Sequence, residues 1–157
     1  MTPAAALAAL RAAEARDGAP NLKQRRAMLL SLAREVKKRA PDIMAVLDAE
    51  YEGRAPIETL LADVLLVADA ALYVRRNLWL WMRPRRVSVP YPFWPARARE
   101  EFVPKGVIGI MAPWNYPVQL ALLPAIDAIA AGNRVCVKPS EALPRTAALI
   151  AEILRDA

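Results

Sequence analysis

The segment VIGIMAPWNYPVQLALLPAIDAIAAGNRVCVK, residues 107–138, decides the expected fold of this chain. It begins with a short apolar run at 107–112, has a helical composition over 117–131, and ends with the β-rich residues 134–138 after a Gly132-Asn133 stop signal. The connection between the two runs is long enough to join two parallel strands. The pattern therefore predicts a β-α-β unit, followed by a further helix that Pro144 begins.

The sequence before this segment predicts helices. Alanine and leucine dominate residues 2–16, Asn21 can cap a second helix, and Pro41 and Pro56 each begin another, the last running towards Trp79. The basic residues of the second helix are expected to be solvated: Arg25, Arg26, Arg34, Lys37 and Lys38. The apolar face of the fourth is expected to hold Leu60, Leu61, Val64, Leu65 and Ala68.

A change of composition separates these helices from the β-α-β unit. The stretch MRPRRVSVPYPFWPARAREEFVPKG, residues 82–106, has five prolines and short alternating pieces, which indicate extended segments or edge strands. We therefore predict a helical region over 1–83, an extended connector over 84–104 and an incomplete α/β unit over 105–157.

Composition excludes several kinds of active site. The 157 residues carry a net charge of +6, one cysteine and no histidine, which removes catalytic triads that depend on histidine and leaves no metal site. The five glycines fit no phosphate-binding loop. One cysteine cannot form an intrachain disulfide, and the charged N-terminus lacks the pattern of a signal peptide, so a cytoplasmic protein is expected.

One uncharged segment, Gly106–Ile126, is long enough to span a bilayer. Its prolines Pro113, Pro117 and Pro124 would free carbonyl groups that lipid cannot satisfy. We therefore expect no membrane partner.

Asn115 is an unusual residue in this apolar setting. If 107–112 is a parallel strand, the loop that contains Asn115 lies at the carboxyl end of the strand, where open α/β sheets bind ligands. Pro113 and Pro117 restrict this loop, and a rigidly aimed amide suits the stabilisation of a developing oxyanion. The alternative is that Asn115 only caps the helix at Pro117 or closes an Asx-turn.

A family resemblance favours the functional interpretation. Residues 104–147 resemble the opening of the cofactor domain of the aldehyde dehydrogenase superfamily, through PWNYP at 113–117, AAGN at 130–133 and KPSE at 138–141. Residues 82–106 resemble the bacterial branch that is similar to coniferyl aldehyde dehydrogenase. The resemblance implies an α/β fold in which 105–157 is the first β-α-β-α unit of a Rossmann-like, partial NAD-binding domain.

The resemblance also implies roles for individual residues. Asn115 matches the residue whose amide helps to hold the oxyanion of the thiohemiacetal, and Lys138 and Glu141 match the pair that holds the adenosine ribose. The cofactor channel would be lined by the backbone of Ile110, Met111, Ala112, Pro113 and Trp114, with Pro139 and Ser140 shaping the next turn. A carboxylate at 141 would repel a 2′-phosphate, which favours NAD and leaves NADP possible.

Two parts of the family's reaction find no match in this sequence. They are the cysteine thiolate that attacks the aldehyde and the glutamate that activates water. Cys136, between two valines of the second strand, is expected to lie in the core. We therefore expect the N-terminal part of an NAD(P)-dependent enzyme that oxidises aldehydes to carboxylic acids, inactive by itself. In the full-length enzyme, the resemblance implies an aldehyde and a nicotinamide cofactor as partners in a homo-oligomer.

Two other functions remain open alternatives. An open sheet edge could make the chain a non-catalytic interaction module. The stretch YVRRNLWLWMRPRR, residues 73–86, interleaves aromatic and basic residues and could bind nucleic acid or an anionic membrane. A packed helix with solvated arginines explains the same stretch without a ligand, so no nucleic-acid partner is expected. Leu143 lacks a side-chain cap for the last helix, which leaves the start of that helix in doubt.

Overall fold

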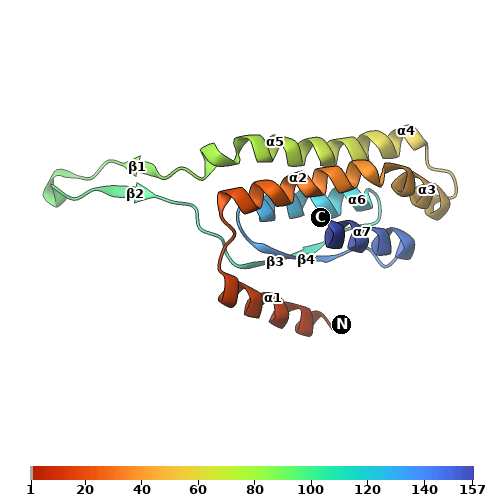
Figure 1. Cartoon of the computed structure of the whole chain (residues 1–157), viewed down its shortest axis with the longest axis horizontal. Helices are drawn as coiled ribbons and strands as arrows, with labels where there is room; N and C mark the ends of the chain where they lie inside the picture. Colours follow the sequence, from red (N-terminus) through yellow and green to blue (C-terminus); the bar gives the residue numbers. More distant parts are fainter. Residues whose placement is uncertain (1) are drawn as a thin grey trace.

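The computed structural model describes residues 2–157, and its first half is helical (Figure 1). In chain order the elements are α1 (Pro3–Asp17), α2 (Leu22–Lys38), α3 (Ala40–Tyr51), the short α4 (Pro56–Glu58), the π-helix η1 (Thr59–Leu65) and α5 (Leu66–Trp81). The predicted cap at Asn21 is confirmed, because its side chain accepts from the Gln24 N–H at 3.0 Å and the Gln24 side chain accepts from the Asn21 N–H at 2.8 Å.

The second half contains two small sheets. Its elements are β1 (Arg85–Val87), the 3₁₀ turn η2 (Tyr91–Phe93), β2 (Ala98–Glu100), β3 (Val107–Met111), α6 (Pro117–Ala130), β4 (Arg134–Lys138) and α7 (Pro144–Asp156). Strands β1 and β2 form an antiparallel hairpin that projects from the body of the molecule (Figure 1). Strands β3 and β4 are parallel, with Val107 opposite Arg134 and Met111 opposite Lys138, so the predicted β-α-β-α unit is confirmed.

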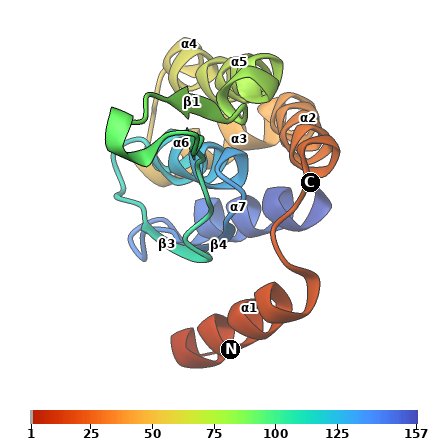
Figure 2. The same ribbon diagram turned by 90° about the vertical axis from the view of Figure 1, so that its left-hand side faces the viewer.

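The parallel sheet lies between helices. Helix α6 packs on one face and α1 contacts both strands from the other side, as Figures 1 and 2 show. Helices α2 and α5 pack against each other and against α6, while α7 contacts α2, α3 and α6. The β-α-β-α unit is therefore covered by the helices of the first half.

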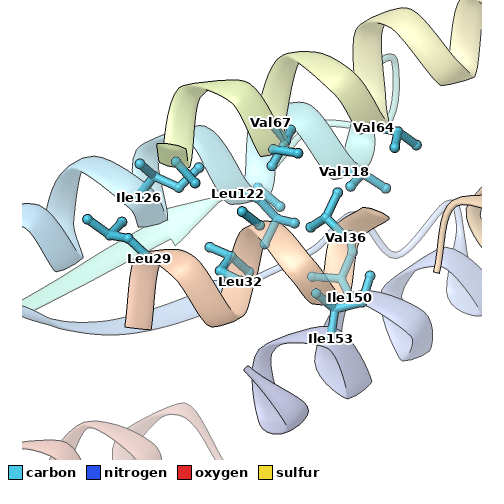
Figure 3. Close-up of a cluster of buried hydrophobic side chains, with 14 of the residues drawn as sticks. Leu29, Leu32, Val36, Val64, Val67, Val118, Leu122, Ile126, Ile150 and Ile153 are labelled. Carbon is cyan, nitrogen blue, oxygen red and sulfur yellow. The ribbon is translucent and has the colours of Figure 1, made fainter. Parts of the chain in front are cut away.

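One hydrophobic core joins the two halves of the chain (Figure 3). Its fully buried side chains come from α2 (Leu29, Leu32, Val36), from η1 and α5 (Val64, Val67), from α6 (Val118, Leu122, Ile126) and from α7 (Ile150, Ile153). Burial of such side chains contributes roughly 1.5–3 kcal/mol each before the entropy of ordering them is counted. The helical half and the α/β unit thus stabilise each other.

The π-helix η1 changes which side chains face this core. Leu61, expected on the apolar face of the fourth helix, is 56% exposed, whereas Thr59 and Asp63 are buried. A π turn holds more residues than an α turn, so the inward face rotates relative to the expected 3.6-residue period. The predicted position of Leu61 is therefore wrong, while Val64 is buried as predicted.

Arg25 also departs from expectation. Arg34, Lys37 and Lys38 are exposed as predicted, but Arg25 is buried. Its guanidinium donates to the carbonyl of Pro20 at 2.7 Å and to the carbonyl of Ala130 at 3.0 Å. The last carbonyl groups of a helix lack partners within the helix, so Arg25 completes the end of α6.

Cys136 is half-buried and forms no disulfide, so its predicted place in the core is wrong. Within residues 2–157 the parallel sheet has only the strands β3 and β4, and each has one unpaired edge. The side chains of β4 are consequently less covered than those of a central strand.

Candidate functional site

The carboxyl ends of β3 and β4 bring the predicted site residues to one edge of the sheet. Met111 lies opposite Lys138, and the N–H of Ala112 donates to the carbonyl of Lys138 at 3.0 Å. The loop 112–116 and the loop 139–143 therefore start side by side. We call residues 110–116 and 138–143 the carboxyl edge.

The side chains along the first loop alternate in exposure. Ile110 and Ala112 are buried, whereas Met111 is 85% exposed and Trp114 is 59% exposed. Pro113 is exposed as well. The loop thus has an anchored backbone and presents a largely apolar surface beside the amide of Asn115.

The side chain of Asn115 has no structural task among the described residues. Helix α6 has Tyr116 at its N-cap position and no side-chain cap from there, so the alternative that Asn115 caps this helix is wrong. Asn115 is exposed, and within residues 2–157 its amide makes no hydrogen bond. Its two N–H donors are therefore available to a ligand.

A second asparagine shows what a structural amide looks like in this fold. The buried Asn133 accepts from the N–H groups of Lys105 at 2.7 Å and Gly106 at 2.9 Å, and it donates to the carbonyl of Ala128 at 3.3 Å. Asn133 thereby ties the start of β3 to the end of α6. The contrast indicates that packing within this chain does not require the amide of Asn115.

The second loop presents an exposed ion pair. Lys138 contacts Glu141, and their side chains are 62% and 84% exposed. The hydrogen bond from Lys138 lowers the pKa of the Glu141 carboxyl, with a smaller contribution from the hydrogen bond of a backbone N–H. Ser140 is buried and accepts from the N–H of Ala142 at 3.3 Å, while Pro139 is half-buried. The turn is therefore ordered, and its charged groups face solvent.

A buried ion pair lies beneath the first loop. Asp63 is fully buried and pairs with Arg54 at 3.0 Å, while its other oxygen accepts from the N–H groups of Val118 at 3.1 Å and Gln119 at 2.9 Å. Burial raises the pKa of the Asp63 carboxyl, and the two hydrogen bonds and Arg54 act in the opposite direction. Asp63 thus caps α6 from a distant part of the sequence.

Aromatic rings complete this layer. The guanidinium of Arg54 lies 5.1 Å from the ring centre of Tyr51 and 4.9 Å from that of Tyr116. The hydroxyl of Tyr51 donates to the carbonyl of Trp114, and the hydroxyl of Tyr116 donates to Glu58 at 3.2 Å. The backbone next to Asn115 is therefore held by residues of the helical half.

Glu50 of α3 caps the N-terminus of α7, for which Leu143 offers no side-chain acceptor. It accepts from the N–H groups of Arg145 at 2.7 Å and Thr146 at 3.0 Å, and from the hydroxyl of Thr146. Sequence reasoning noted that Leu143 offers no cap but did not find Glu50, Arg54 or Asp63. The available signal was Asp63 itself, a lone carboxylate in the apolar run LLADVLL at 60–66.

The carboxyl edge is an open surface in this chain. A cavity of about 790 Å³ belongs to the β1–β2 hairpin, and one of about 410 Å³ lies between α5, Phe102 and the end of α6. A third, of about 340 Å³, reaches Pro139 from the side of α1. Among the described residues, none of these three is lined by Asn115, Lys138 or Glu141.

The basic and aromatic stretch at 73–86 makes contacts within the chain. The guanidinium of Arg83 lies 4.3 Å from the ring centre of Trp79, and the rings of Tyr73 and Trp81 are 6.1 Å apart. The side chains of Tyr73, Trp79 and Trp81 nevertheless remain 62%, 44% and 42% exposed. Among residues 2–157, no helix is long and apolar enough to cross a membrane. No cluster of metal-binding side chains occurs in that part of the chain.

Comparisons with known proteins identify the family of this chain. The model of the aldehyde dehydrogenase family matches residues 2–157. A probable coniferyl aldehyde dehydrogenase of Pseudomonas aeruginosa is 35% identical over 144 residues, which are 92% of this chain and 30% of that protein. A coniferyl aldehyde dehydrogenase of a Pseudomonas species is 35% identical over 149 residues, 95% of this chain and 31% of that protein.

Solved structures show the same fold. AldH of Staphylococcus aureus, solved in a substrate-bound state, superposes with a TM-score of 0.92 at 26% identity over 99% of this chain and 34% of its own. An NAD-dependent benzaldehyde dehydrogenase of Corynebacterium glutamicum gives a TM-score of 0.79 at 24% identity over 94% of this chain and 31% of its own.

The chain belongs to the aldehyde dehydrogenase family. It spans about a third of the length of the relatives that it matches.

Proposed function

We propose that this chain supplies the oxyanion donor and the ribose-binding pair of an NAD(P)-dependent aldehyde dehydrogenase, which oxidises aldehydes to carboxylic acids. The observation that carries the proposal is the carboxyl edge. There the free amide of Asn115 and the exposed pair Lys138 and Glu141 follow neighbouring parallel strands. Open α/β sheets bind nucleotides at such an edge.

The residues of the second loop fit the ribose of a nicotinamide cofactor. Lys138 can donate to a hydroxyl and Glu141 can accept from two vicinal hydroxyls, because both side chains face solvent. A 2′-phosphate would meet the charge of Glu141, so NAD is preferred over NADP. When bound, the cofactor accepts a hydride from the substrate. Pro139, the buried Ser140 and the backbone of residues 110–114 would border the bound molecule.

Asn115 would stabilise negative charge on the oxygen of the aldehyde. A donor aimed in advance stabilises such charge without reorganisation, and removal of one donor of this kind typically costs roughly 100- to 1,000-fold in turnover. Tyr51 holds the carbonyl of Trp114, which supports a fixed direction for the amide. Aromatic aldehydes of the coniferyl type are the proposed substrates, by similarity to the two Pseudomonas relatives.

Titration of the isotope-labelled chain with NAD at millimolar concentration tests the cofactor site. We expect amide shifts in NMR spectra at 110–114 and 138–141, at least tenfold weaker binding for Lys138→Met and Glu141→Gln, and weaker binding of NADP. Lys23→Met, on the exposed face of α2, is the control and should bind NAD like the parent chain. Shifts confined to other regions, or equal binding by all variants, would refute the proposal.

The chain by itself should not oxidise aldehydes. Its only cysteine, Cys136, is half-buried in β4, away from the loops of the carboxyl edge. We expect no NADH absorbance with NAD and coniferyl aldehyde, and sustained NADH formation would contradict this part of the proposal.

The full-length enzyme is proposed to be a cytoplasmic homo-oligomer. The β1–β2 hairpin is exposed along both strands, and Tyr91, Phe93 and Trp94 are 85%, 65% and 71% exposed. Exposed apolar groups on a projecting hairpin suit a protein interface. These 157 residues hold one cysteine and therefore no disulfide within the chain, which suits a reducing compartment. Light scattering during size-exclusion chromatography of the full-length enzyme should show an assembly. This assembly should dissociate when Phe93 and Trp94 are both changed to Ser.

A further inference from the structure

Both loops of the carboxyl edge lead into helices that cannot cap themselves. Tyr116 stands at the N-cap of α6 and Leu143 at that of α7, and neither side chain accepts a hydrogen bond from the helix. The first N–H groups of a helix have no partner within it. Each loop would therefore end on a frayed turn if no other group supplied acceptors.

Carboxylates of the helical half supply these acceptors. Asp63 accepts from Val118 and Gln119 at the start of α6. Glu50 accepts from Arg145 and Thr146 at the start of α7. A negative charge at a helix N-terminus is also favoured by the helix dipole. Asp63 and Glu50, which are distant from the loops in sequence, thus fix the points at which the loops end.

The support at Asp63 extends to the loop itself. Arg54 orients Asp63 through a contact of 3.0 Å between buried side chains, and its ring contacts with Tyr51 and Tyr116 leave it little freedom. Tyr51 donates to the carbonyl of Trp114, the residue before Asn115. The backbone on both sides of Asn115 is therefore held by one connected set of side chains.

The support at Glu50 is similar, and although Glu50 precedes Tyr51 in α3, its hydrogen bonds go to other groups. The buried Thr146 donates its hydroxyl to Glu50, so this carboxylate binds two N–H groups and one hydroxyl. None of these groups contacts Arg54 or Asp63 by a hydrogen bond among the described residues. Each loop thus has its own anchor in the helical half.

We propose that Asp63, held by Arg54, and Glu50 are positioning residues: the first fixes the loop with Asn115, and the second fixes the loop with Lys138 and Glu141. This inference rests on the proposed function, because it says which residues orient the two loops of the proposed site. The helical half is then part of the active-site machinery, beyond its role in the core.

A crossed pair of variants tests the inference in the full chain. Asp63→Asn keeps the shape of the side chain but removes its charge, and Glu50→Gln does the same at α7. Backbone order parameters from NMR relaxation should fall from about 0.85 to below about 0.6 at 113–116 in Asp63→Asn and at 139–143 in Glu50→Gln. In each variant the other loop should keep its order, so each variant controls for the other.

Two milder variants can test the same inference if Asp63→Asn fails to fold. Tyr51→Phe removes only the hydroxyl that contacts Trp114, and Thr146→Val removes only the hydroxyl that contacts Glu50. They should loosen the same loops in the same crossed pattern. Equal loss of order in both loops, or no loss in either, would overturn the inference, because a purely structural role predicts no such selectivity.

The NAD titration separates this inference from the proposed function. Glu50→Gln should weaken NAD binding at 138–141 at least threefold, while Asp63→Asn should leave the contacts at 138–141 unchanged. If the crossed pattern of loop order appears but the parent chain does not bind NAD, the positioning role stands and the proposed function fails. If NAD binds and the crossed pattern is absent, the positioning role fails alone.

Discussion

At the scale of single residues, the two loops differ in how their polar groups are held. The side-chain amide of Asn115 is exposed and makes no hydrogen bond among the described residues, and the side chains of Lys138 and Glu141 pair with each other. Asp63 is buried, with one oxygen bound by two N–H groups of α6 and the other 3.0 Å from Arg54. The side chains that could bind a ligand are therefore exposed, and the side chain that holds the loop with Asn115 is buried. This division is what a preorganised site requires.

The ion pair of the second loop predicts a titration. Lys138→Met should raise the pKa of Glu141 towards the ordinary value of about 4.3, because the largest cause of its lowered pKa is the hydrogen bond from Lys138. A lowered folded-state pKa contributes stability above the ordinary value, and that contribution is lost as the pH falls through the folded-state pKa. The side-chain carboxyl signal of Glu141 in NMR measures this, with Lys23→Met as control. An unchanged pKa in Lys138→Met would contradict the assignment.

Gly132 predicts a local stability effect. Its φ is +87°, and a Cβ there would lie 2.3 Å from the guanidinium of Arg25, which is held by two carbonyl groups. Gly132→Ala should lower the free energy of unfolding by about 1–3 kcal/mol in urea.

Gly109 is the matched control, because its φ is not positive and a Cβ would meet nothing within 4 Å. Gly109→Ala should change stability by less than about 0.5 kcal/mol. Equal effects of the two substitutions would show that Arg25 moves aside at no cost.

At the scale of elements, α6 is fixed at both ends by the helical half. Asp63 binds its first turn and Arg25 binds the carbonyl of Ala130 at its end. Helix α6 joins the two strands of the sheet, so its position also determines where β3 and β4 end. The anchoring of α6 therefore links packing to the site.

Arg25 and Arg34 lie on the same helix and make a matched comparison. Arg25→Met removes two hydrogen bonds and leaves the buried carbonyl of Ala130 without its side-chain partner, so we expect a loss of about 1–3 kcal/mol in the free energy of unfolding. Arg34 is exposed, and Arg34→Met should cost less than about 0.5 kcal/mol. Urea unfolding measures both. Similar values would mean that the α6 terminus is satisfied by water in the variant.

At the scale of the whole molecule, the core crosses the proposed boundaries at 83 and 104. Side chains of α2 and α5 meet those of α6 and α7 in one cluster (Figure 3). The division into three regions remains a prediction about sequence organisation. Packing predicts that the body of the chain unfolds as one cooperative unit.

Leu122→Ala tests this cooperativity. Leu122 is fully buried at the centre of the cluster, and its truncation should cost about 2–5 kcal/mol. Hydrogen exchange should rise together in α2, α5, α6 and α7. Leu80→Ala, at a side chain that is 51% exposed, is the control and should change little. Loss of protection restricted to α6 and α7 would show two separate units instead.

The sequence by itself determined the order of the elements and the loops of the site. Prolines, Asn21 and Gly132 act through local backbone chemistry, and a strand end followed by a restricted loop can be recognised without neighbours. The roles proposed for Asn115, Lys138 and Glu141 came instead from the resemblance of PWNYP and KPSE to the aldehyde dehydrogenase family.

Only the tertiary structure decided which distant residues hold those loops. Asp63 contacts α6 and Glu50 contacts α7 across long stretches of sequence, Arg25 is buried against the end of α6, and Leu61 turns outward in a π-helix. Each of these outcomes depends on which surfaces meet when the core forms. Local periodicity carries no information about these tertiary contacts. An N–H or carbonyl group without a local partner can be satisfied by any suitable group that packing brings near.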